Sequence, residues 1–171
     1  PAVRGRLRAC VPLRDLTWLR VGGPAEVMFR PADAEDLAQF CCGLPENVPV
    51  IAVGVGSNLL VRDGGVPGAV VRLGRPFARV MGEGDYLVVG AGALDAKVSL
   101  AAAERGLSGL EFLSGVPGTI GGALRMNAGA YGREMRDIVI SAEAIDRAGK
   151  VHTLNSEELG FGYRSSRVPE S

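Results

Sequence analysis

Glycine is concentrated in two segments of this sequence, and both can hold a ligand against the main chain. The chain has 25 glycines in 171 residues, about twice the usual share of ~7%. Glycine tolerates positive φ and lets a ligand approach the backbone closely, because it has no side chain. The glycine-rich segments are therefore the first candidates for a binding site.

The first glycine segment follows the apolar run Val48–Val53 and has the sequence Gly54-Val55-Gly56-Ser57-Asn58-Leu59. A glycine loop at a strand end directs several backbone N–H groups at one point, which suits a phosphate, and Ser57 and Asn58 add side-chain donors. The loop is not a Rossmann fingerprint, because the third glycine would fall at Leu59, and no Walker-type Gly-Lys follows it. Taken alone, a tight turn without a ligand explains the loop equally well.

The second glycine segment is longer and consists of two stretches, Gly115-Val116-Pro117-Gly118-Thr119-Ile120-Gly121-Gly122-Ala123 and Met126-Asn127-Ala128-Gly129-Ala130-Tyr131-Gly132. If Thr119 begins a helix, the N–H groups of its first turn are unpaired and point toward an anion. Gly121 and Gly122 then let a flat ring or a diphosphate lie against the backbone. A glycine-rich surface loop is the alternative, but two such segments in one neutral chain favour a binding site.

Tyr163 and Arg164 form the third candidate, within Phe161–Ser166. An arginine binds a carboxylate or phosphate in a bidentate manner, and a neighbouring tyrosine adds one hydrogen bond through its phenol. From the spacing alone, a solvated loop arginine is the better interpretation.

A small α/β lobe is predicted for residues 1–74, around the first glycine segment. The helical spacing of Leu37, Phe40 and Cys41 predicts a helix over Pro31–Gly43, with Cys41 in the core. Continuous apolar runs predict three strands, at Val27–Phe29, Val48–Val53 and Ala69–Leu73.

The pattern changes in residues 75–171, which we expect to form a second, α+β lobe. A helix is predicted over Asp95–Arg105, ending at Gly106. Three further strands are predicted, at Tyr86–Val89, Val139–Asp146 and Val151–Leu154, and Ala148-Gly149 joins the last two as a hairpin. Antiparallel pairing is therefore expected in this lobe.

The charge balance argues against a general nucleic-acid binder. The chain has 19 basic and 19 acidic residues, whereas neutralising phosphates needs a basic excess. The basic cluster at the start of the chain is predicted to be a frayed, solvated terminus; its members are Arg4, Arg6, Arg8 and Arg14. No apolar run approaches the ~20 residues that span a bilayer, so we expect neither membrane insertion nor a signal peptide.

The cysteines and the single histidine do not suggest a metal or redox site. Cys10, Cys41 and Cys42 contain no Cys-X-X-Cys pair, and His152 is distant in sequence. We therefore expect no metal, no disulfide framework and a reducing, cytoplasmic location. His152 lies in an alternating stretch, which favours a histidine on a strand face over a catalytic one.

Together, in this order, the three candidate segments closely resemble the UDP-N-acetylenolpyruvoylglucosamine reductase family of bacterial cell-wall synthesis. The resemblance covers nearly the whole chain, from Leu16-Thr17-Trp18 and Val21-Gly22-Gly23 to Gly162-Tyr163-Arg164-Ser165-Ser166. Its specificity comes from the combination of Val116–Ala123, Met126–Gly132 and Gly162–Ser166, since each motif alone is weak.

The resemblance implies an α+β, two-lobed FAD-binding fold of the vanillyl-alcohol-oxidase/p-cresol-methylhydroxylase type. It implies that the FAD pyrophosphate is held by Gly54, Gly56, Ser57 and Asn58, with Val55 and Leu59 also in the cofactor site. It further implies that the flavin is lined by Gly115, Val116, Pro117, Gly118, Thr119, Gly121, Gly122 and Ala123, with Asn127, Gly129 and Ala130 nearby. Arg164 matches the family's active-site arginine, and Tyr163 matches its substrate-contacting tyrosine.

The activity that the resemblance implies is a two-step reduction. NADPH reduces FAD, and hydride then passes to the enolpyruvyl double bond of the UDP-sugar substrate, giving UDP-N-acetylmuramate. Arg164 would stabilise the negative charge that develops on the carboxylate side of the substrate. This activity belongs to peptidoglycan synthesis in the cytoplasm, and hence to cell-wall biogenesis, cell shape, the cell cycle and cell division. The resemblance implies no nucleic-acid partner, and the sequence leaves the oligomeric state open.

The chain departs from the family at its end. The family has a C-terminal substrate domain with a serine proton donor and a glutamate, and neither residue can be placed here. Because Pro169-Glu170-Ser171 closes no element, we expect this chain to be an FAD-binding part that does not complete turnover alone. Two alternatives remain: a non-catalytic FAD- or nucleotide-binding module, and another flavin oxidase of the same fold.

Overall fold

The chain forms two compact units in the computed structural model, which describes residues 3–167. The first unit contains the described residues up to Pro76 together with Asp146–Lys150, and the second contains Phe77–Ile145 and the described residues from Val151 onward. The end of the chain at Pro169–Ser171, where the sequence predicts no element, lies outside the described residues.

A mixed four-stranded sheet forms the centre of the first unit, in the order β1-β2-β4-β3. β1 pairs with β2 in the antiparallel sense, whereas β2 and β3 both run parallel to β4. The strands are β1 (Arg6–Pro12), β2 (Pro24–Arg30), β3 (Val50–Val53) and β4 (Val66–Arg72). The three strands predicted for this lobe are thus confirmed, with β2 and β4 longer than expected.

The prediction of a frayed N-terminus is wrong, because Arg6 and Arg8 of the basic cluster lie in the edge strand β1. Leu7 pairs with Phe29 and Val11 with Ala25 along the ladder to β2. Before the strand, the Arg4 guanidinium lies 2.7 Å from an Asp33 carboxylate oxygen. The arginines alternate with apolar residues, a pattern that fits an edge strand with one solvated face.

Helix α1 (Ala34–Cys42) confirms the helix predicted between the first two lobe strands. The Asp33 side chain caps it by accepting a hydrogen bond from the Asp36 N–H, and the helix ends at Gly43. Phe40 stacks on Phe29 of β2 with ring centroids 4.1 Å apart. Cys41 is buried, as predicted for a core residue, and its burial raises the pKa of the thiol.

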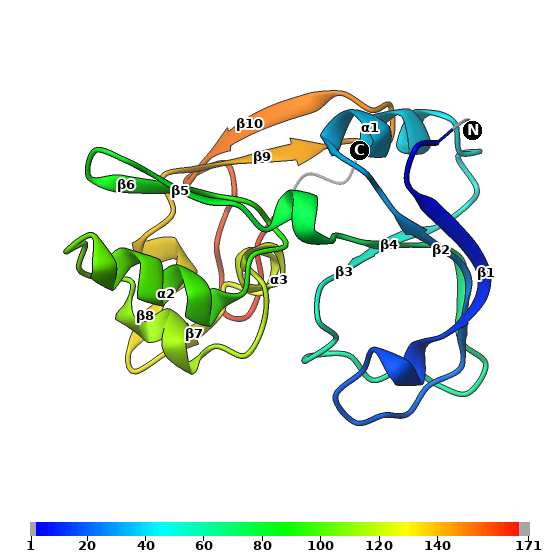
Figure 1. The fold of residues 1–171 in the computed structure, drawn as a ribbon, viewed down its shortest axis with the longest axis horizontal. Helices are drawn as coiled ribbons and strands as arrows, with labels where there is room; N and C mark the ends of the chain where they lie inside the picture. Colours follow the sequence, from blue (N-terminus) through cyan, green and yellow to red (C-terminus); the bar gives the residue numbers. More distant parts are fainter. Residues whose placement is uncertain (1–2, 168–171) are drawn as a thin grey trace. The chain divides into compact units, whose positions relative to one another are not determined.

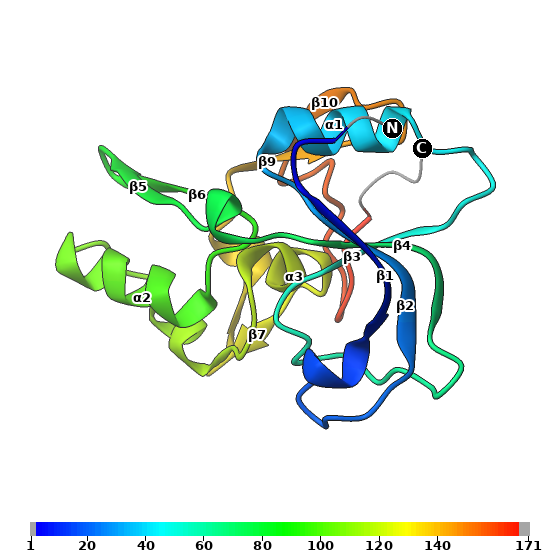
Figure 2. The ribbon, with the colours of Figure 1, turned by 45° about the vertical axis from the view of Figure 1, so that its right-hand side comes forward.

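The two faces of this sheet are covered by different parts of the unit. Helix α1 packs on one face, in a cluster with Phe29, Ala69 and Val71. The other face carries Met28 and Val70, which pack against the 3-10 turn η1 (Leu13–Asp15) and the segments that follow η1 and β3. In Figures 1 and 2 these segments lie away from α1.

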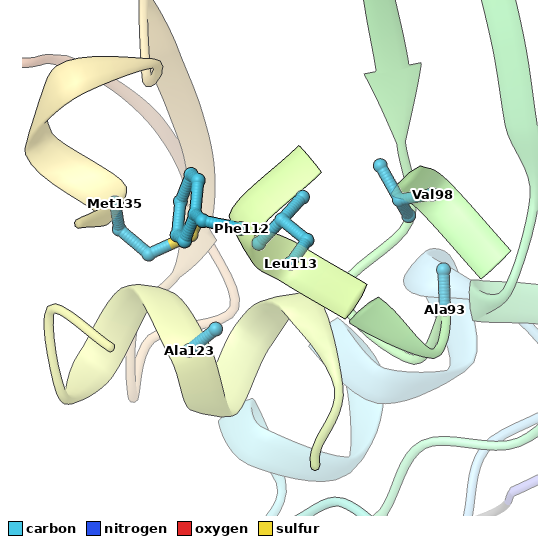
Figure 3. Packing of buried hydrophobic residues seen from close by; sticks show 6 residues of the cluster. All are labelled: Ala93, Val98, Phe112, Leu113, Ala123 and Met135. Carbon is cyan, nitrogen blue, oxygen red and sulfur yellow. The ribbon is translucent and has the colours of Figure 1, made fainter. Parts of the chain in front are cut away.

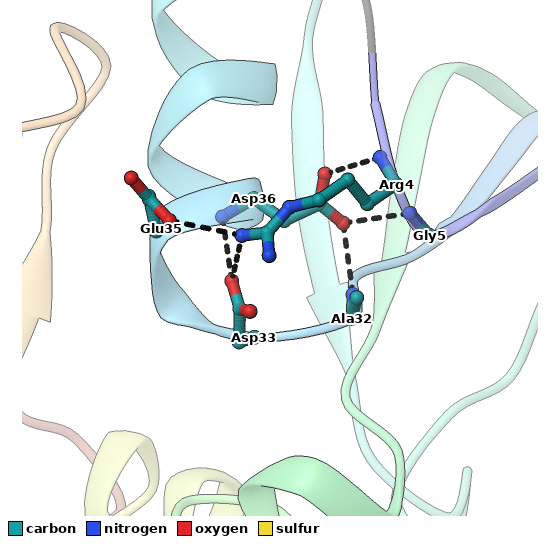
Figure 4. A network of polar contacts seen from close by, with 6 residues as sticks. All are labelled: Arg4, Gly5, Ala32, Asp33, Glu35 and Asp36. Atoms are coloured by element: carbon teal, nitrogen blue, oxygen red, sulfur yellow. Dashed lines mark hydrogen bonds and ion pairs between the residues drawn. The ribbon is translucent and has the colours of Figure 1, made fainter.

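The start of the chain is fixed to α1 by the carboxylate of Asp36, which is completely buried. Its oxygens accept hydrogen bonds from the backbone N–H groups of Arg4, Gly5 and Ala32 at 2.7–2.8 Å, as Figure 4 shows. Burial raises the pKa of Asp36, but these hydrogen bonds and the charge of Arg4 outweigh it, so the pKa is lowered overall. The ionised carboxylate therefore stabilises this unit.

Replacing Asp36 with alanine is expected to destabilise the first unit by about 3 kcal/mol, because buried N–H groups lose their acceptor. Urea unfolding followed by fluorescence of Trp18, the single tryptophan, measures the effect. Glu35→Ala is the matched control: this exposed acid also pairs with Arg4 but contributes about 0.5 kcal/mol or less. Equal effects of the two variants would show that the buried network is unimportant.

In the described part of the second unit, three helical segments follow one another between short antiparallel strand pairs, and a 3-10 turn comes later in the chain. The helical segments are α2 (Asp95–Glu104), the 3-10 helix η3 (Glu111–Gly115) and α3 (Ile120–Arg125). The paired strands are β5 (Val80–Glu83) with β6 (Tyr86–Val89), β7 (Gly129–Ala130) with β8 (Arg133–Glu134), and β9 (Ser141–Ile145) with β10 (Val151–Asn155). The predicted antiparallel pairing, α2, β6 and the β9–β10 hairpin are confirmed, whereas β5, β7 and β8 were not predicted.

The core of the second unit gathers residues from its helical segments. Figure 3 shows Val98 of α2, Phe112 and Leu113 of η3, and Ala123 of α3 together with Ala93 and Met135. All six are at most 3% exposed. The core thus holds the second glycine segment between α2 and the short 3-10 turn η4 (Met135–Asp137).

The β9–β10 hairpin turns through Gly149, as predicted. Gly149 has φ +79°, and a Cβ there would lie 2.6 Å from the Ala38 carbonyl oxygen of α1. The turn therefore requires glycine, and the Arg147 guanidinium donates a hydrogen bond to the Pro45 carbonyl. His152 lies half-buried on β10, confirming the strand-face prediction. Within residues 3–167, no helix combines the length and hydrophobicity needed to span a membrane.

Candidate functional site

The loop Gly54–Leu59 keeps its backbone donors free, as a phosphate-binding loop requires. It follows β3 directly, at the carboxyl end of a parallel strand, where α/β sheets bind ligands. Within the described part of the chain, none of the hydrogen bonds between residues has a backbone N–H of Gly54–Asn58 as its donor. The side chains of Ser57 and Asn58 likewise have no partner among those residues.

Gly56 fixes the shape of this loop. It has φ +72°, and a Cβ there would lie 2.7 Å from the Leu16 carbonyl oxygen. The Gly56 carbonyl also accepts a hydrogen bond from the Trp18 N–H at 3.3 Å. The first part of the resemblance, Leu16–Trp18, therefore packs against the glycine loop, and only glycine fits at this contact.

An apolar hollow of about 380 Å³ lies beside the loop. It is lined mainly by aliphatic side chains of β3, β4 and the flanking segments, including Leu13, Leu16, Val53, Leu59 and Val70. A flat apolar ring fits such a lining better than a charged group does. The first unit thus combines free N–H donors with an adjoining apolar surface.

At the start of α3, two N–H groups that were predicted to be free are paired inside the protein. Thr119 does precede the helix, but the Ile120 N–H donates to the Ala93 carbonyl and the Gly121 N–H to the Ala91 carbonyl, at 3.0 and 2.8 Å. These donors are used inside the protein because the segment before α2 packs alongside α3. Two donors expected to face an anion are therefore engaged, while no hydrogen bond within the described chain has the Gly122 N–H as its donor.

The glycines of the second segment have different surroundings. At Gly121 a Cβ would meet Ala91 at 3.0 Å, so this glycine serves close packing. Gly122 is exposed, and the nearest atom to a Cβ there is the Thr119 hydroxyl at 3.7 Å. A Cβ on Gly115 would lie 2.7 Å from the Tyr131 ring. Gly122 and its exposed surroundings are therefore the part of this segment open to a ligand.

The remaining residues of the segment divide by exposure. Pro117 is exposed and Val116 and Gly118 are half-buried, whereas Thr119 and Ala123 are buried. Ala123 belongs to the hydrophobic core of this unit. The segment thus has one face toward the core and one toward solvent.

A hollow of about 510 Å³ brings together two groups of predicted site residues that are far apart in sequence. Gly129 and Ala130 line it from β7, and Tyr163 and Arg164 line it from the end of the described chain. The other lining residues were not predicted; they are Tyr131, Gly132, Arg133, Glu134, Arg136 and Asp137. Two of the predicted cofactor residues of the second unit therefore share one hollow with both predicted substrate residues.

Tyr163 and Arg164 form the tip of a tight turn. The Ser165 N–H donates to the Gly162 carbonyl at 3.3 Å, and the Gly162 N–H donates to the Ser165 carbonyl at 2.9 Å. Tyr163 is 90% exposed, and Arg164 has φ +52°. A side chain other than glycine or asparagine is unusual at positive φ, and such strain clusters at functional sites.

The strained turn is anchored to the end of α3. Asn127 is 1% exposed; its Nδ2 donates to the Gly162 carbonyl and its Oδ1 accepts from the Arg136 N–H, both at 3.0 Å. Arg125 donates to the Ser166 carbonyl, and the Ser166 hydroxyl donates to the Arg125 carbonyl. The Asn127 amide is thus engaged inside the protein, where it links the turn to the wall of the hollow.

Asp95 is a buried acid that sequence analysis did not single out. It begins α2, is 0% exposed, and neither carboxylate oxygen has a hydrogen-bond partner among residues 3–167. Burial raises the pKa of its carboxyl from 3.8 to about 7. An acid at the start of a helix is an ordinary sequence feature, so the sequence carried no signal of this burial.

Comparison with known protein families identifies one domain along most of the chain. The profile of the family described as FAD binding domain matches residues 25–155. The match includes the first glycine loop, the second glycine segment and the β9–β10 hairpin.

Similar proteins of known name are reductases. The chain is 62% identical over 170 residues to UDP-N-acetylenolpyruvoylglucosamine reductases of Rhodospirillum rubrum and Paramagnetospirillum magneticum. The alignments cover 99% of this chain but only 53% and 55% of those proteins. The chain therefore spans about half the length of the relatives it matches.

Solved structures confirm the predicted fold class. The reductase of Thermus caldophilus superposes with a TM-score of 0.81 at 40% identity, covering 98% of this chain and 58% of that one. The 6-hydroxy-D-nicotine oxidase of Arthrobacter nicotinovorans superposes with a TM-score of 0.68 at 18% identity, covering 96% and 41%. The second likeness, at this low identity, shows that the two chains share a fold.

Proposed function

Because the chain belongs to the FAD binding domain family, we propose that it binds FAD and supplies the flavin-binding part of an NADPH-dependent reductase. The substrate of this reductase is UDP-N-acetylglucosamine enolpyruvate, and its product is UDP-N-acetylmuramate. The observation that carries the proposal is 62% identity to such reductases along 99% of the chain. The proposed setting is peptidoglycan synthesis in the cytoplasm.

The residues of the first unit fit the phosphates of FAD. The free N–H groups of Gly54–Leu59 offer donors to a diphosphate, and the Ser57 and Asn58 side chains extend them. The apolar hollow beside the loop offers a surface for a ring. The loop geometry therefore agrees with the role that the resemblance implies.

In the second unit, we assign the flavin to the exposed side of Val116–Ala123, with Gly129 and Ala130 beside it. Gly122 lets a flat ring approach the backbone, because it is exposed and only the Thr119 hydroxyl, at 3.7 Å, lies near the place of a Cβ. Asn127 serves this site as a positioning residue, since its amide is already bonded to Gly162 and Arg136. The division into lobes at residues 1–74 and 75–171 stays a prediction.

FAD, when bound, supplies the redox chemistry that connects NADPH to the enolpyruvyl double bond. The Arg164 guanidinium binds the substrate carboxylate and stabilises the negative charge that grows on that side as hydride is added. The planar guanidinium suits this role, because it presents paired N–H donors to a carboxylate. The Tyr163 hydroxyl donates a further hydrogen bond to the substrate. The strained turn holds both side chains at the rim of one hollow.

A non-catalytic FAD-binding module and a flavin oxidase of the same fold are the competing functions. The similarity to 6-hydroxy-D-nicotine oxidase supports the fold alone, at 18% identity. The Tyr163–Arg164 turn beside Gly129 and Ala130 favours the reductase, because it offers a cation to a carboxylate substrate. His152 lies on β10 and is the single histidine, which disfavours a histidine-linked flavin.

Titration of the 171-residue chain with FAD, followed by quenching of flavin fluorescence, tests the proposal. We expect saturable binding at one site. Gly56→Ala should weaken that binding by at least about tenfold, since positive φ and the contact with Leu16 exclude a side chain. Gly64→Ala is the matched control, because nothing lies within 4 Å of a Cβ there. Absence of saturable FAD binding by the unmodified chain would contradict the proposal.

A further inference from the structure

Three arginines lie side by side across the sheet of the first unit. Arg6 of β1 is directly opposite Arg30 of β2 in the antiparallel register. Phe29 and Val71 are partners in the parallel ladder of β2 and β4. Arg30 follows the first of them and Arg72 follows the second. Adjacent strands are about 4.8 Å apart, so Arg6, Arg30 and Arg72 form one row of neighbouring cations, called here the arginine row.

The arginine row lies on the sheet face that α1 leaves free. Met28 and Val70, two residues before Arg30 and Arg72 on their strands, belong to the cluster on that face. Phe29 and Val71 point to the opposite face, where they pack with Phe40 of α1. Because side chains alternate along a strand, Arg30 and Arg72 share the face of Met28 and Val70.

The glycine loop lies at the same edge and over the same face of the sheet. Val53, the last residue of β3, is the partner of Arg72 in the parallel ladder, and Gly54 follows it directly. Val53 and Leu59 both pack in the cluster on the face of the arginine row. The free N–H groups of the loop and the guanidinium groups of the row therefore lie in the same region of this unit.

No acid of the described chain neutralises the row. None of the ion pairs or side-chain hydrogen bonds within residues 3–167 involves Arg6, Arg30 or Arg72. Arg72 is half-buried, and burial together with the neighbouring charge of Arg30 lowers the pKa of its guanidinium. Like charges opposite one another on a sheet are destabilising. The row lowers the stability of the ligand-free protein, and an anion would relieve this.

We infer that Arg30 and Arg72 bind the phosphate groups of the dinucleotide whose diphosphate lies on the loop Gly54–Leu59. This assignment rests on the proposed function and adds to it the side chains that carry the positive charge. Guanidinium groups bind phosphate oxygens through paired, charge-assisted hydrogen bonds. Arg6, at the exposed edge, contributes to the field of the row.

The test compares binding of FAD, ADP and riboflavin by the 171-residue chain and by Arg72→Gln and Arg30→Gln variants. We expect each variant to bind FAD and ADP about tenfold more weakly, with riboflavin, which has no phosphate, unaffected. Arg14→Gln is the matched control, because Arg14 lies in η1 at the other end of the sheet. Arg72→Lys should give an intermediate loss, since it keeps the charge but not the paired geometry.

A second readout separates phosphate binding from a structural role. Without ligand, Arg72→Gln should raise the midpoint of thermal unfolding, because it removes repulsion from Arg30. With saturating FAD, the rise in midpoint caused by the ligand should be smaller than in the unmodified chain. A variant that unfolds earlier without ligand would overturn the inference.

The outcomes distinguish the inference from the function on which it rests. Unchanged FAD and ADP affinity in both arginine variants overturns the inference and leaves the proposed function intact. An unmodified chain that binds neither FAD nor ADP overturns both. Equal loss of riboflavin and FAD affinity places the arginines away from the phosphates and also overturns the inference.

Discussion

Removing the side chain of Arg164 is expected to lower reductase turnover about a thousandfold while leaving FAD affinity within about twofold. The guanidinium is proposed to stabilise charge that develops only as hydride is added, and loss of one such donor costs about 10²–10³ in rate. FAD affinity should persist because Arg164 is exposed at the tip of its turn, and its proposed partner is the substrate carboxylate and not the cofactor. Turnover is measured after placing this chain in the Rhodospirillum rubrum reductase in place of the matching half.

The backbone of Arg164 decides which variant is informative. Its φ of +52° suits glycine better than alanine, so Arg164→Gly removes the side chain without straining the turn. If the side chain stabilises the transition state, Arg164→Gly and Arg164→Ala lose turnover equally. A glycine variant that keeps more than about a tenth of the turnover would show that Arg164 acts through the shape of the turn. Tyr163→Phe, which removes one hydroxyl, should lose about tenfold.

The elements that could be predicted from sequence are those whose signal is local. The apolar runs of β3 and β4 and the helical spacing of α1 identify elements buried on at least one face. Edge strand β1 was missed because most of its residues are exposed. The four arginines in and around it also suggested a solvated tail. Its pairing with β2 is a tertiary property that no local pattern specified.

The candidate site was predictable where residue type alone fixes the chemistry. Gly56 is required by its φ and by its contact with Leu16, and the pattern of glycines revealed the loop. The pairing of the N–H groups at the start of α3 could not be predicted from residue type. Their acceptors, the carbonyl groups of Ala91 and Ala93, lie almost thirty residues earlier in the chain. The arginine row was hidden for the same reason, since Arg6, Arg30 and Arg72 come together only through strand register.

The stability of the second unit is expected to fall as the pH rises from 4 to 8, because of Asp95. Its carboxyl is completely buried without a partner, and burial raises its pKa from 3.8 to about 7. Between these values the folded chain keeps a proton that the unfolded chain has released, so folding loses free energy as pH rises. One pH unit corresponds to about 1.4 kcal/mol, and we expect a total loss of about 4 kcal/mol.

The variant Asp95→Asn isolates this effect, because the amide is similar in shape and does not titrate. At pH 4 the carboxyl is neutral in the folded chain, and the two proteins should differ by about 1 kcal/mol or less. At pH 8 the variant should be more stable by about 4 kcal/mol, since the folded wild type then carries a buried, unpaired charge. Subtracting the two pH profiles removes the contribution of Asp36, whose lowered pKa acts in the opposite direction.

Hydrogen exchange of the α2 amides is the suitable measurement, because Trp18 fluorescence reports on the first unit. Protection of α2 should fall in the wild type between pH 4 and 8, after correction for the intrinsic exchange rate, and stay level in Asp95→Asn. A difference between the proteins that does not change with pH would mean that Asp95 is ionised in the folded state at pH 4. In that case the carboxylate must have a partner, because burial without one raises the pKa of a carboxyl and keeps it neutral.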